Sequence, residues 1–423
     1  MNSPDTLESK PGKESSSEQK QPDRFLRKGV IFLTVTAFLS TTGIGIFNPV
    51  LPFITRRYLS NPGDLALAVG WLTAIYSLCQ FVVAPGLGLL SDRFGRRPLL
   101  MICLLGSVVG YVLFGLGGAL WILLLSRIID GMTGGNFSIL LAYIGDVIAP
   151  EERGKYFGLF GAAGGIGFII GPVVGGLVST LGYQWPAYLV AGLTALNMIW
   201  GYFYLPESLK QEHRAARIKL ANLNPLKQVG SVFQLALVRW LLLVGFFYAL
   251  PFAVLQSNLI VLVMNSLAWT AAEIGVTYTL IGVLDILMQG IIFPRLLPVF
   301  GEATLTIAGL ITEIAAFFTL GLLAFIHSPV CLLAGIILFG IGSGLFEPAQ
   351  NSLVSQVAGP EKQGIVQGSN QSLQSLARIL GPLAGGVLYA QVGHATPYWS
   401  GALMAGLAIV LTCLAIPGLR AGR

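Results

Sequence analysis

Two short stretches of the sequence decide the predicted fold. Residues 171–176 read Gly-Pro-Val-Val-Gly-Gly, and residues 381–386 read Gly-Pro-Leu-Ala-Gly-Gly. A second pair has the same offset of 210 residues, because residues 150–154 read Pro-Glu-Glu-Arg-Gly and residues 360–364 read Pro-Glu-Lys-Gln-Gly. Two matches at one offset indicate an internal repeat, so the chain is predicted to consist of two related halves.

The segments around these stretches are apolar. The 423 residues are 54% hydrophobic and 10% charged, and the mean hydropathy is +0.76. A soluble domain carries about 25% charged residues, so these charges are too few to cover a wetted surface. The composition therefore excludes a soluble enzyme, a disordered protein, a nucleic-acid binder and a disulfide scaffold.

Continuous apolar runs recur along the whole chain. A transmembrane helix needs about 20 mainly apolar residues. Twelve runs satisfy this requirement, at about 29–54, 66–90, 98–117, 119–148, 155–179, 184–205, 236–264, 272–295, 303–326, 329–357, 364–390 and 395–416. The runs lack the alternation of a membrane β-barrel. We therefore expect an all-α polytopic membrane protein with twelve transmembrane helices in two pseudo-symmetric six-helix bundles.

The polar segments divide the chain into five parts. We expect a disordered tail at 1–28, an N-terminal bundle at 29–205, a central loop at 206–235, a C-terminal bundle at 236–416 and a tail at 417–423. With a cytoplasmic N-terminus, all Lys and Arg residues fall inside except those at 56, 57, 127 and 378. Because basic residues favour the cytoplasmic side, both termini and the central loop are predicted to be cytoplasmic.

A charged turn follows the second span. Its glycine and charged positions are Gly88, Asp92, Arg93, Gly95, Arg96 and Arg97. Gly95 permits a backbone turn that other residues resist. Asp92 can accept hydrogen bonds from a helix N-terminus or an arginine, which would lock one conformation and release another. The alternative interpretation is an ordinary basic anchor on the cytoplasmic side.

The fifth predicted span is rich in glycine. Gly161, Gly165, Gly171 and Gly175 would leave a groove in which another helix packs closely. Pro172 would bend the helix because it removes a backbone hydrogen bond. The alternative is routine use, because membrane helices contain glycine and proline in many settings.

These motifs together resemble the major facilitator superfamily, and in particular its drug/proton antiporter branch, which includes tetracycline efflux proteins. The turn after the second span resembles the family's signature loop. Arg127 and Gly131 match its helix-four motif, and the helix-five antiporter motif matches Gly161, Gly165, Gly171, Pro172, Gly175 and Gly176. The resemblance implies alternating access, drug export in exchange for protons, antibiotic resistance and a place in the bacterial inner membrane.

Six charged residues stand out because they lie well inside predicted spans. A charge at a helix centre costs about 2.5–3.5 kcal/mol on insertion scales, so such residues usually mark ion or substrate routes. Arg127 and Asp130 are three positions apart and share one helix face. They are candidates for proton coupling, with a self-compensating structural pair as the alternative.

In the second half, the charged residues well inside spans are three acids and one base, Asp285, Glu313, Glu347 and Arg378. One acid can pair with Arg378. A carboxyl group left without a partner in low dielectric tends to hold a proton and to lose it when water enters. These four residues are therefore predicted to couple proton movement, with a structural hydrogen bond as the alternative for any one of them.

The resemblance adds detail at these positions. Glu313 matches the helix-nine acid of tetracycline exporters, whereas their helix-eight histidine falls at Asp285 and their helix-one acid at Ser40. Pro348 matches the family in helix ten, but Glu347 before it does not. These departures argue against tetracycline itself as the substrate and place the coupling residues in the second half.

Neutral polar and aromatic residues within spans are candidates for the substrate pocket: Asn48, Tyr76, Gln80, Tyr248, Gln256, Asn258, Gln289, Gln350 and Asn351. Three functions remain open: a proton-coupled exporter of hydrophobic drug-like molecules, a nutrient symporter or facilitator, and a membrane sensor or intramembrane enzyme. No nucleotide-binding loop is present, so an ion gradient or the solute gradient itself must drive transport. We expect protons, a small hydrophobic substrate and the lipid bilayer as partners, a monomer, no enzymatic activity, and no cofactor, metal or nucleic acid.

Overall fold

The computed structural model describes residues 20–148, 152–209 and 236–421. These residues form helices, with no β-strand among them. Of the tail expected at 1–28, residues 1–19 lie outside the described ranges and residues 20–28 belong to the first helix. The central loop expected at 206–235 lies outside them from residue 210 onward, and the tail expected at 417–423 is helical as far as Ala421. Within the described ranges, the all-α prediction is confirmed.

Each predicted span falls on one helix, on part of one, or on successive helices. The N-terminal half holds α1 (Lys20–Phe47), α2 (Leu51–Arg56), α3 (Leu65–Phe94), α4 (Arg96–Leu116), α5 (Leu120–Thr133), α6 (Asn136–Val147), α7 (Arg153–Val178) and α8 (Trp185–Tyr204). The C-terminal half holds α10 (Ala236–Leu267), α11 (Ala271–Leu287), α12 (Phe293–Ile326), α13 (Pro329–Val387) and α14 (Thr396–Ala421). Eight described stretches are long and apolar enough to cross a membrane, and Ala271–Ile326 alone holds two predicted spans.

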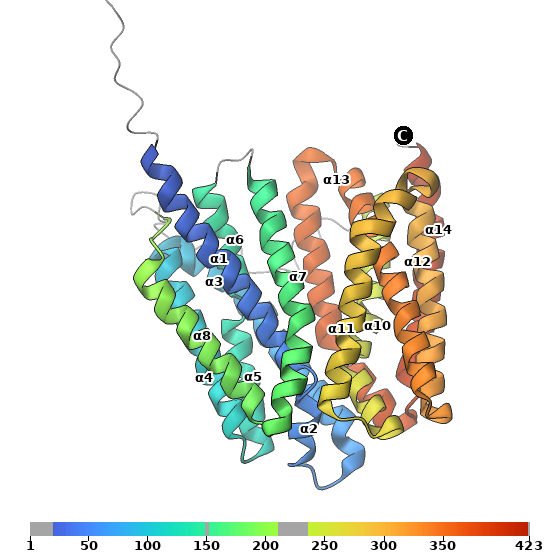
Figure 1. The fold of residues 1–423 in the computed structure, drawn as a ribbon. Coiled ribbons are helices and arrows are strands. Elements are labelled where there is room, and N and C mark those ends of the chain that lie inside the picture. The colour runs from blue at the N-terminus through green and yellow to red at the C-terminus, as the bar shows by residue number, and fades with distance from the viewer. Residues whose placement is uncertain (1–19, 149–151, 210–235, 422–423) are drawn as a thin grey trace, which may run out of the picture.

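Glycines and chain length explain where helices and predicted spans differ. The span expected at 119–148 is split into α5 and α6 at Gly134 and Gly135. Helix α12 contains a kink at Gly301, where φ is 73°. Helix α13 has 59 residues, and at about 1.5 Å per residue it would be far longer than the bilayer core of about 30 Å. It therefore contains two spans, which Figure 1 shows as two limbs.

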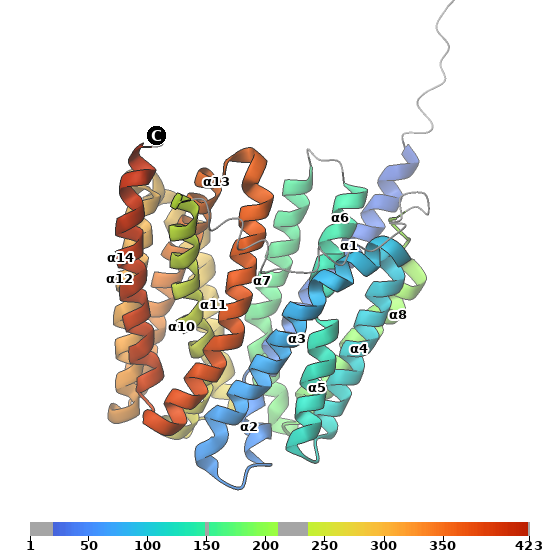
Figure 2. The ribbon, with the colours of Figure 1, turned by 180° about the vertical axis from the view of Figure 1, so that it is seen from behind.

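The helices form two groups that correspond to the two halves of the chain. Helix α1 packs on α7 and α8, while α10 and α12 pack on α13 and α14. Contacts between the groups come mainly from α3 against α13 and from α7 against α11. Figures 1 and 2 show that the groups converge at the end near α2 and diverge toward the end where α1 begins.

The apolar core explains this shape. One cluster of buried side chains joins both halves and includes Leu65 and Val69 of α3, Leu259 of α10 and Ile274 of α11. A second cluster lies within the N-terminal half, and three smaller clusters lie within the C-terminal half. The halves therefore share a core near α2, the closed end, and keep separate cores toward the opposite, open end.

Candidate functional site

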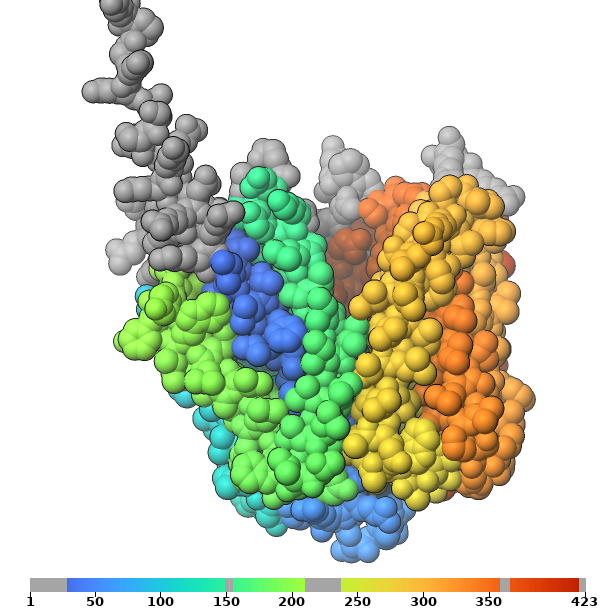
Figure 3. All heavy atoms as spheres, viewed as in Figure 1, coloured from blue at the N-terminus to red at the C-terminus, as the bar shows by residue number. Residues whose placement is uncertain are grey.

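A cavity of about 610 Å³ lies between the halves, on the open side of their shared core. Figure 3 shows a hollow between α7 and α11 that widens toward the open end. The cavity is lined by Gly164, Gly165, Phe168, Ile169, Phe252, Leu255, Gln256, Leu259, Tyr278, Ile281, Gly282, Asp285, Ile286, Gln289, Gly290 and Phe339. The lining is mostly apolar, and Asp285 is the one carboxylic acid among the described residues that form it.

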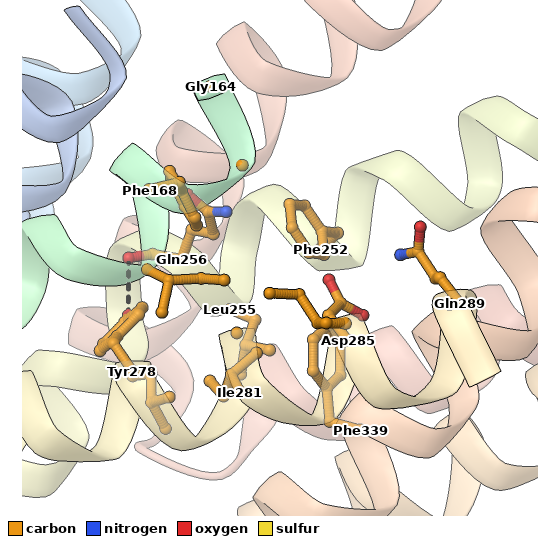
Figure 4. Close-up of a pocket in the computed structure, with 16 residues that line it drawn as sticks. Gly164, Phe168, Phe252, Leu255, Gln256, Tyr278, Ile281, Asp285, Gln289 and Phe339 are labelled. Carbon is orange, nitrogen blue, oxygen red and sulfur yellow. Dashed lines mark hydrogen bonds between the residues drawn. The ribbon is translucent and has the colours of Figure 1, made fainter. Parts of the chain in front are cut away.

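Asp285 lies in the last turn of α11, immediately before a π-helical turn at Met288–Ile292. Such turns are frequent at functional sites because they redirect the side chains around them. The Ser343 hydroxyl of α13 donates to Asp285 Oδ1 over 3.0 Å. Figure 4 shows the Asp285 carboxylate among Phe252, Phe339 and Gln289. The cavity therefore offers one carboxylate surrounded by aromatic rings and amides.

The other two acids of the C-terminal half that were proposed for proton coupling, Glu313 and Glu347, lie outside the cavity lining. Glu313 of α12 is 1% exposed, and its Oε1 atom has no hydrogen-bond partner among the described residues. A Cβ atom added at Gly342 of α13 would lie 2.6 Å from Glu313 Cγ, so the bare glycine makes room for the acid. Glu347 accepts a hydrogen bond from the Tyr248 hydroxyl over 3.2 Å.

The three acid candidates of this half lie along one part of α13. Glu313 lies against Gly342, Asp285 accepts a hydrogen bond from Ser343, and Glu347 follows one turn later on α13. The fourth candidate, Arg378 of α13, is exposed. Among the described residues, no carboxylate lies close enough to Arg378 to form an ion pair like those of Arg96 and Arg127. The acids thus form one cluster that extends from the cavity surface at Asp285 to the closed interior at Glu313.

Arg127 and Asp130 form a separate buried pair in the N-terminal half. Arg127 Nη2 lies 3.3 Å from Asp130 Oδ2, and the two residues are 6% and 2% exposed. Four rings face the Arg127 guanidinium, at 3.9 Å for Phe47, 5.3 Å for Phe114, 5.5 Å for Tyr76 and 6.0 Å for Tyr111. Such cation–π contacts stabilise a desolvated cation.

The pocket candidates divide into two groups. Gln256 and Gln289 line the cavity. Four others make contacts away from it: Tyr248 with Glu347, Gln80 with the Gly134 carbonyl, Asn258 with the Val254 carbonyl and Gln350 with the Leu241 carbonyl. Tyr76 faces Arg127, Asn48 is half-buried beyond the end of α1, and Asn351 is exposed.

Sequence reasoning missed most of the actual lining. Phe168, Phe252, Phe339 and Tyr278 supply its aromatic surface, and Tyr278 donates to the Gln256 carbonyl over 3.4 Å. In a membrane helix, apolar side chains face both lipid and protein, so hydrophobicity does not distinguish a lining residue. The spacing of Asp285 and Gln289, four positions apart on one helix face, was the available signal.

The charged turn after α3 forms a network within the N-terminal half. Gly95 has a φ of 104°, which glycine adopts readily. Asp92 pairs with Arg96 at 2.6 Å, and Arg96 also reaches Asp146 of α6 at 3.1 Å. Arg93 is exposed, and the Ser91 hydroxyl donates to the Gly88 carbonyl over 2.7 Å.

Glu207, in the Leu-Pro-Glu-Ser stretch after α8, is a further acid at this turn. Its two carboxylate oxygens accept from the backbone N–H groups of Arg96 and Arg97 over 2.8 and 3.1 Å. These donors open α4, so Glu207 caps that helix from beyond the end of α8. Asp92, expected to accept from a helix N-terminus or an arginine, pairs with the Arg96 side chain.

The antiporter motif of the fifth predicted span lies on α7, and its glycines fall into two groups. A Cβ atom at Gly171 would lie 2.6 Å from the Thr42 carbonyl oxygen, and one at Gly175 would collide with the Ile46 carbonyl, so both glycines admit α1. At Gly176 it would lie 2.7 Å from the Ala271 carbonyl of α11. At Gly161 and Gly165 it would meet nothing within 4 Å. Gly171, Gly175 and Gly176 are thus packed against other helices. Gly161 and Gly165 face open space.

The two halves meet through a pair of equivalent crossings. Gly176 of α7 lies against Ala271 of α11, and a Cβ atom added at Gly386 of α13 would in the same way lie 2.8 Å from the Ala66 carbonyl oxygen of α3. The reciprocal glycines are Gly275, against the Pro172 carbonyl, and Gly70, against the Pro382 carbonyl. The repeated Gly-Pro-x-x-Gly-Gly stretches therefore form both contacts that close the molecule.

A two-lobed helical membrane protein with a central cavity and buried carboxyl groups belongs to the class of secondary transporters. A profile of the Major Facilitator Superfamily matches residues 33–382, and the chain belongs to this family. It is 35% identical over 399 residues to the class C tetracycline resistance protein of Escherichia coli, covering 93% of this chain and 96% of that protein.

Further relatives agree with this assignment. The chain is 29% identical over 367 residues to multidrug resistance protein 2 of Bacillus subtilis, covering 85% of this chain and 88% of that protein. Among solved structures, the human organic anion transporter MFSD10 superposes with a TM-score of 0.69 at 24% identity, covering 92% of this chain and 99% of that one. The predicted family, fold class and transport function are confirmed.

Proposed function

We propose that the protein exports hydrophobic drug-like molecules in exchange for protons, and that Asp285 is the group at which the substrate and the proton meet. The single observation that carries this proposal is the mostly apolar cavity in which Asp285 is the one carboxylic acid among the described lining residues. The resistance proteins of Escherichia coli and Bacillus subtilis are relatives along most of the chain, which supports drugs as the substrate class.

The cavity chemistry disfavours a nutrient symporter. A sugar-like solute needs many hydrogen-bonding side chains, because unpaired polar groups are costly to bury. The polar side chains of the lining are few, and Gln256, Tyr278, Asp285 and Gln289 supply them. Phe168, Phe252 and Phe339 instead offer ring faces to an apolar solute. A hydrophobic molecule of moderate size fits this surface better than a polyol.

The proposed orientation places the open end in the cytoplasm. Helix α1 starts at that end and α14 finishes there (Figure 1), and the Lys and Arg distribution favours cytoplasmic termini. The cavity then faces the cytoplasm of a bacterial inner membrane, ready to collect a substrate. The packed crossings at Gly176 and Gly386 close the outer side.

We assign different roles to the three acids of this half. Asp285 touches the cavity, so it exchanges its proton with the substrate. Glu313 and Glu347 lie off the cavity and hold charge within the lobe, with Tyr248 and Arg378 as their neighbours. Protonation of this cluster lowers its charge in a low-dielectric interior, which favours movement of the lobe.

The test measures efflux of a fluorescent hydrophobic dye from cells that lack their own exporters. Wild-type efflux should stop when an uncoupler collapses the proton gradient. Asp285→Asn and Glu313→Gln should each abolish gradient-driven efflux at unchanged membrane levels, because an amide cannot release a proton. Asp64→Asn is the matched control, since Asp64 is an exposed carboxylate at the closed end.

The outcomes separate the function from the residue assignment. Efflux by the wild type that persists without a proton gradient would contradict proton coupling. Gradient-driven efflux that survives in both variants would keep the function and reject the assigned residues. Loss of efflux in Asp64→Asn as large as in Asp285→Asn would show that the assay reports a general effect of charge.

A further inference from the structure

A second cavity, of about 260 Å³, lies on the outer surface of the N-terminal half between α4 and α8. It is lined by Met101, Ile102, Leu105, Met198, Ile199, Tyr202 and Phe203. Several of these side chains are largely exposed, with Ile102 at 60%, Tyr202 at 61% and Phe203 at 73%. Unlike the central cavity, this second cavity has no acid or amide side chain among the described residues that line it. It faces away from the other half.

Gly201 of α8 lies next to Met101, one of the residues that line this second cavity. A Cβ atom at this position would lie 2.8 Å from Met101 Cε, so the missing side chain lets Met101 settle against α8. The second cavity is thus a furrow between the two helices. The lining residues occupy the first turns of α4 and the last turns of α8, so the furrow lies toward the open, basic end of the molecule.

One arginine stands at the end of the furrow. Arg97 is one turn before Met101, its guanidinium donates to the Tyr202 carbonyl, and its Cζ lies 5.7 Å from the centre of the Tyr202 ring. Arg96 forms ion pairs with Asp92 and Asp146, but in the part of the chain that the structure describes, Arg97 forms none. A half-buried cation therefore adjoins an apolar surface.

We propose that this furrow binds one anionic glycerophospholipid, with an acyl chain along Met101–Leu105 and Met198–Phe203 and the phosphate at Arg97. The furrow lies on the membrane-facing surface, where lipid is the available neighbour, and its apolar lining matches an acyl chain. Arg97 matches the phosphate in charge and in hydrogen-bonding geometry. This site is independent of the substrate cavity.

The charge selects the lipid class. A zwitterionic lipid carries no net charge, so its headgroup gains little from a nearby guanidinium. A basic residue close to the membrane surface favours an anionic lipid by about fivefold, and the preference weakens with salt. Arg57 is the natural comparison, because its Cζ lies 5.0 Å from the centre of the Tyr183 ring near the closed end, away from the furrow.

The experiment uses the full chain in phosphatidylcholine vesicles that contain a trace of photoactivatable lipid with a diazirine in its acyl chain. Phosphatidylglycerol and phosphatidylcholine probes with the same chains are compared, and labelled peptides are identified by mass spectrometry. The phosphatidylglycerol probe should label 101–105 and 198–203 about fivefold more than the phosphatidylcholine probe. Arg97→Gln should remove this preference, while Arg97→Lys and Arg57→Gln should retain it.

Further variants exclude a folding effect. Ile199→Trp should fill the furrow and lower labelling by both probes, with an unchanged melting temperature. Equal labelling of the wild type by the two probes would overturn the proposal. So would a loss of preference in Arg97→Lys as large as in Arg97→Gln, or labelling that avoids both segments. None of these readouts depends on transport, so the site can fail while the proposed function stands.

Discussion

At the scale of single residues, Arg127 shows how a charge is kept inside a membrane. Its guanidinium has one carboxylate partner, Asp130, and lies over the faces of several aromatic rings. Two of its nitrogen atoms, Nε and Nη2, make no hydrogen bond among the described residues. The pair is neutral as a whole, so Asp130 compensates a charge that would otherwise be costly to bury.

We expect Asp130→Asn to destabilise the protein by about 3–5 kcal/mol, because it leaves the Arg127 charge buried and uncompensated. The melting temperature of the purified protein measures this loss. The double variant Arg127→Gln with Asp130→Asn should be more stable than Asp130→Asn alone. Strictly additive losses in the two single variants and the double variant would contradict a coupled pair.

At the scale of helices, close backbone contact forms the junction between the halves. Helices α7 and α13 carry the repeated glycine stretch, and each lies against the first turns of a helix in the other half, α11 or α3. Since lipid tails are as apolar as the side chains, membrane helices associate mainly through packing, and small residues permit the closest approach. A side chain at these glycines must therefore push the halves apart.

We expect Gly275→Ala and Gly70→Ala to weaken the closed end by about 1–3 kcal/mol, because each new methyl group meets a proline carbonyl of the other half. Distances between spin labels on α3 and α13 should lengthen as the population that is open at this end increases. Gly192→Ala is the control, since a Cβ atom there meets nothing within 4 Å. Unchanged distances in both test variants would refute the junction.

At the scale of the whole molecule, the distribution of apolar clusters predicts motion of two rigid halves. The charged turn joins α3, α4, α6 and α8 through Asp92, Arg96, Asp146 and Glu207. These helices all belong to the N-terminal half, so the network stiffens one lobe. The shared core at the closed end is the place where the lobes must separate during alternating access.

We expect Asp92→Asn to slow turnover by about two- to fivefold, because Asp92 is 40% exposed and the loss of a partly exposed pair with Arg96 is small. Substrate affinity should not change, since the turn lies away from the cavity. Turnover is measured from dye efflux, and affinity from binding to the purified protein. An affinity loss as large as the turnover loss would argue against a gating role.

Much of the architecture could be predicted from hydropathy and the repeat, but the contacts could not. The interruption at Gly134 and Gly135 was missed because glycine within an apolar run does not show whether the helix continues. The cap formed by Glu207 on α4 joins residues more than 100 positions apart. Gln350 looked like a pocket residue, yet it donates to the Leu241 carbonyl over 2.6 Å, a pairing that depends on how α10 meets α13.

The amino-acid sequence by itself determined that the chain crosses a membrane as two related sets of helices, because insertion into lipid depends on composition and length. It also marked every buried charge discussed above. Only the tertiary structure decided that Asp285 reaches the cavity while Glu313 does not, because the surroundings of a side chain depend on which helices pack around it. Gly342 of α13 lies against Glu313 of α12 and helps to enclose it. Asp285 of α11 lines the cavity instead.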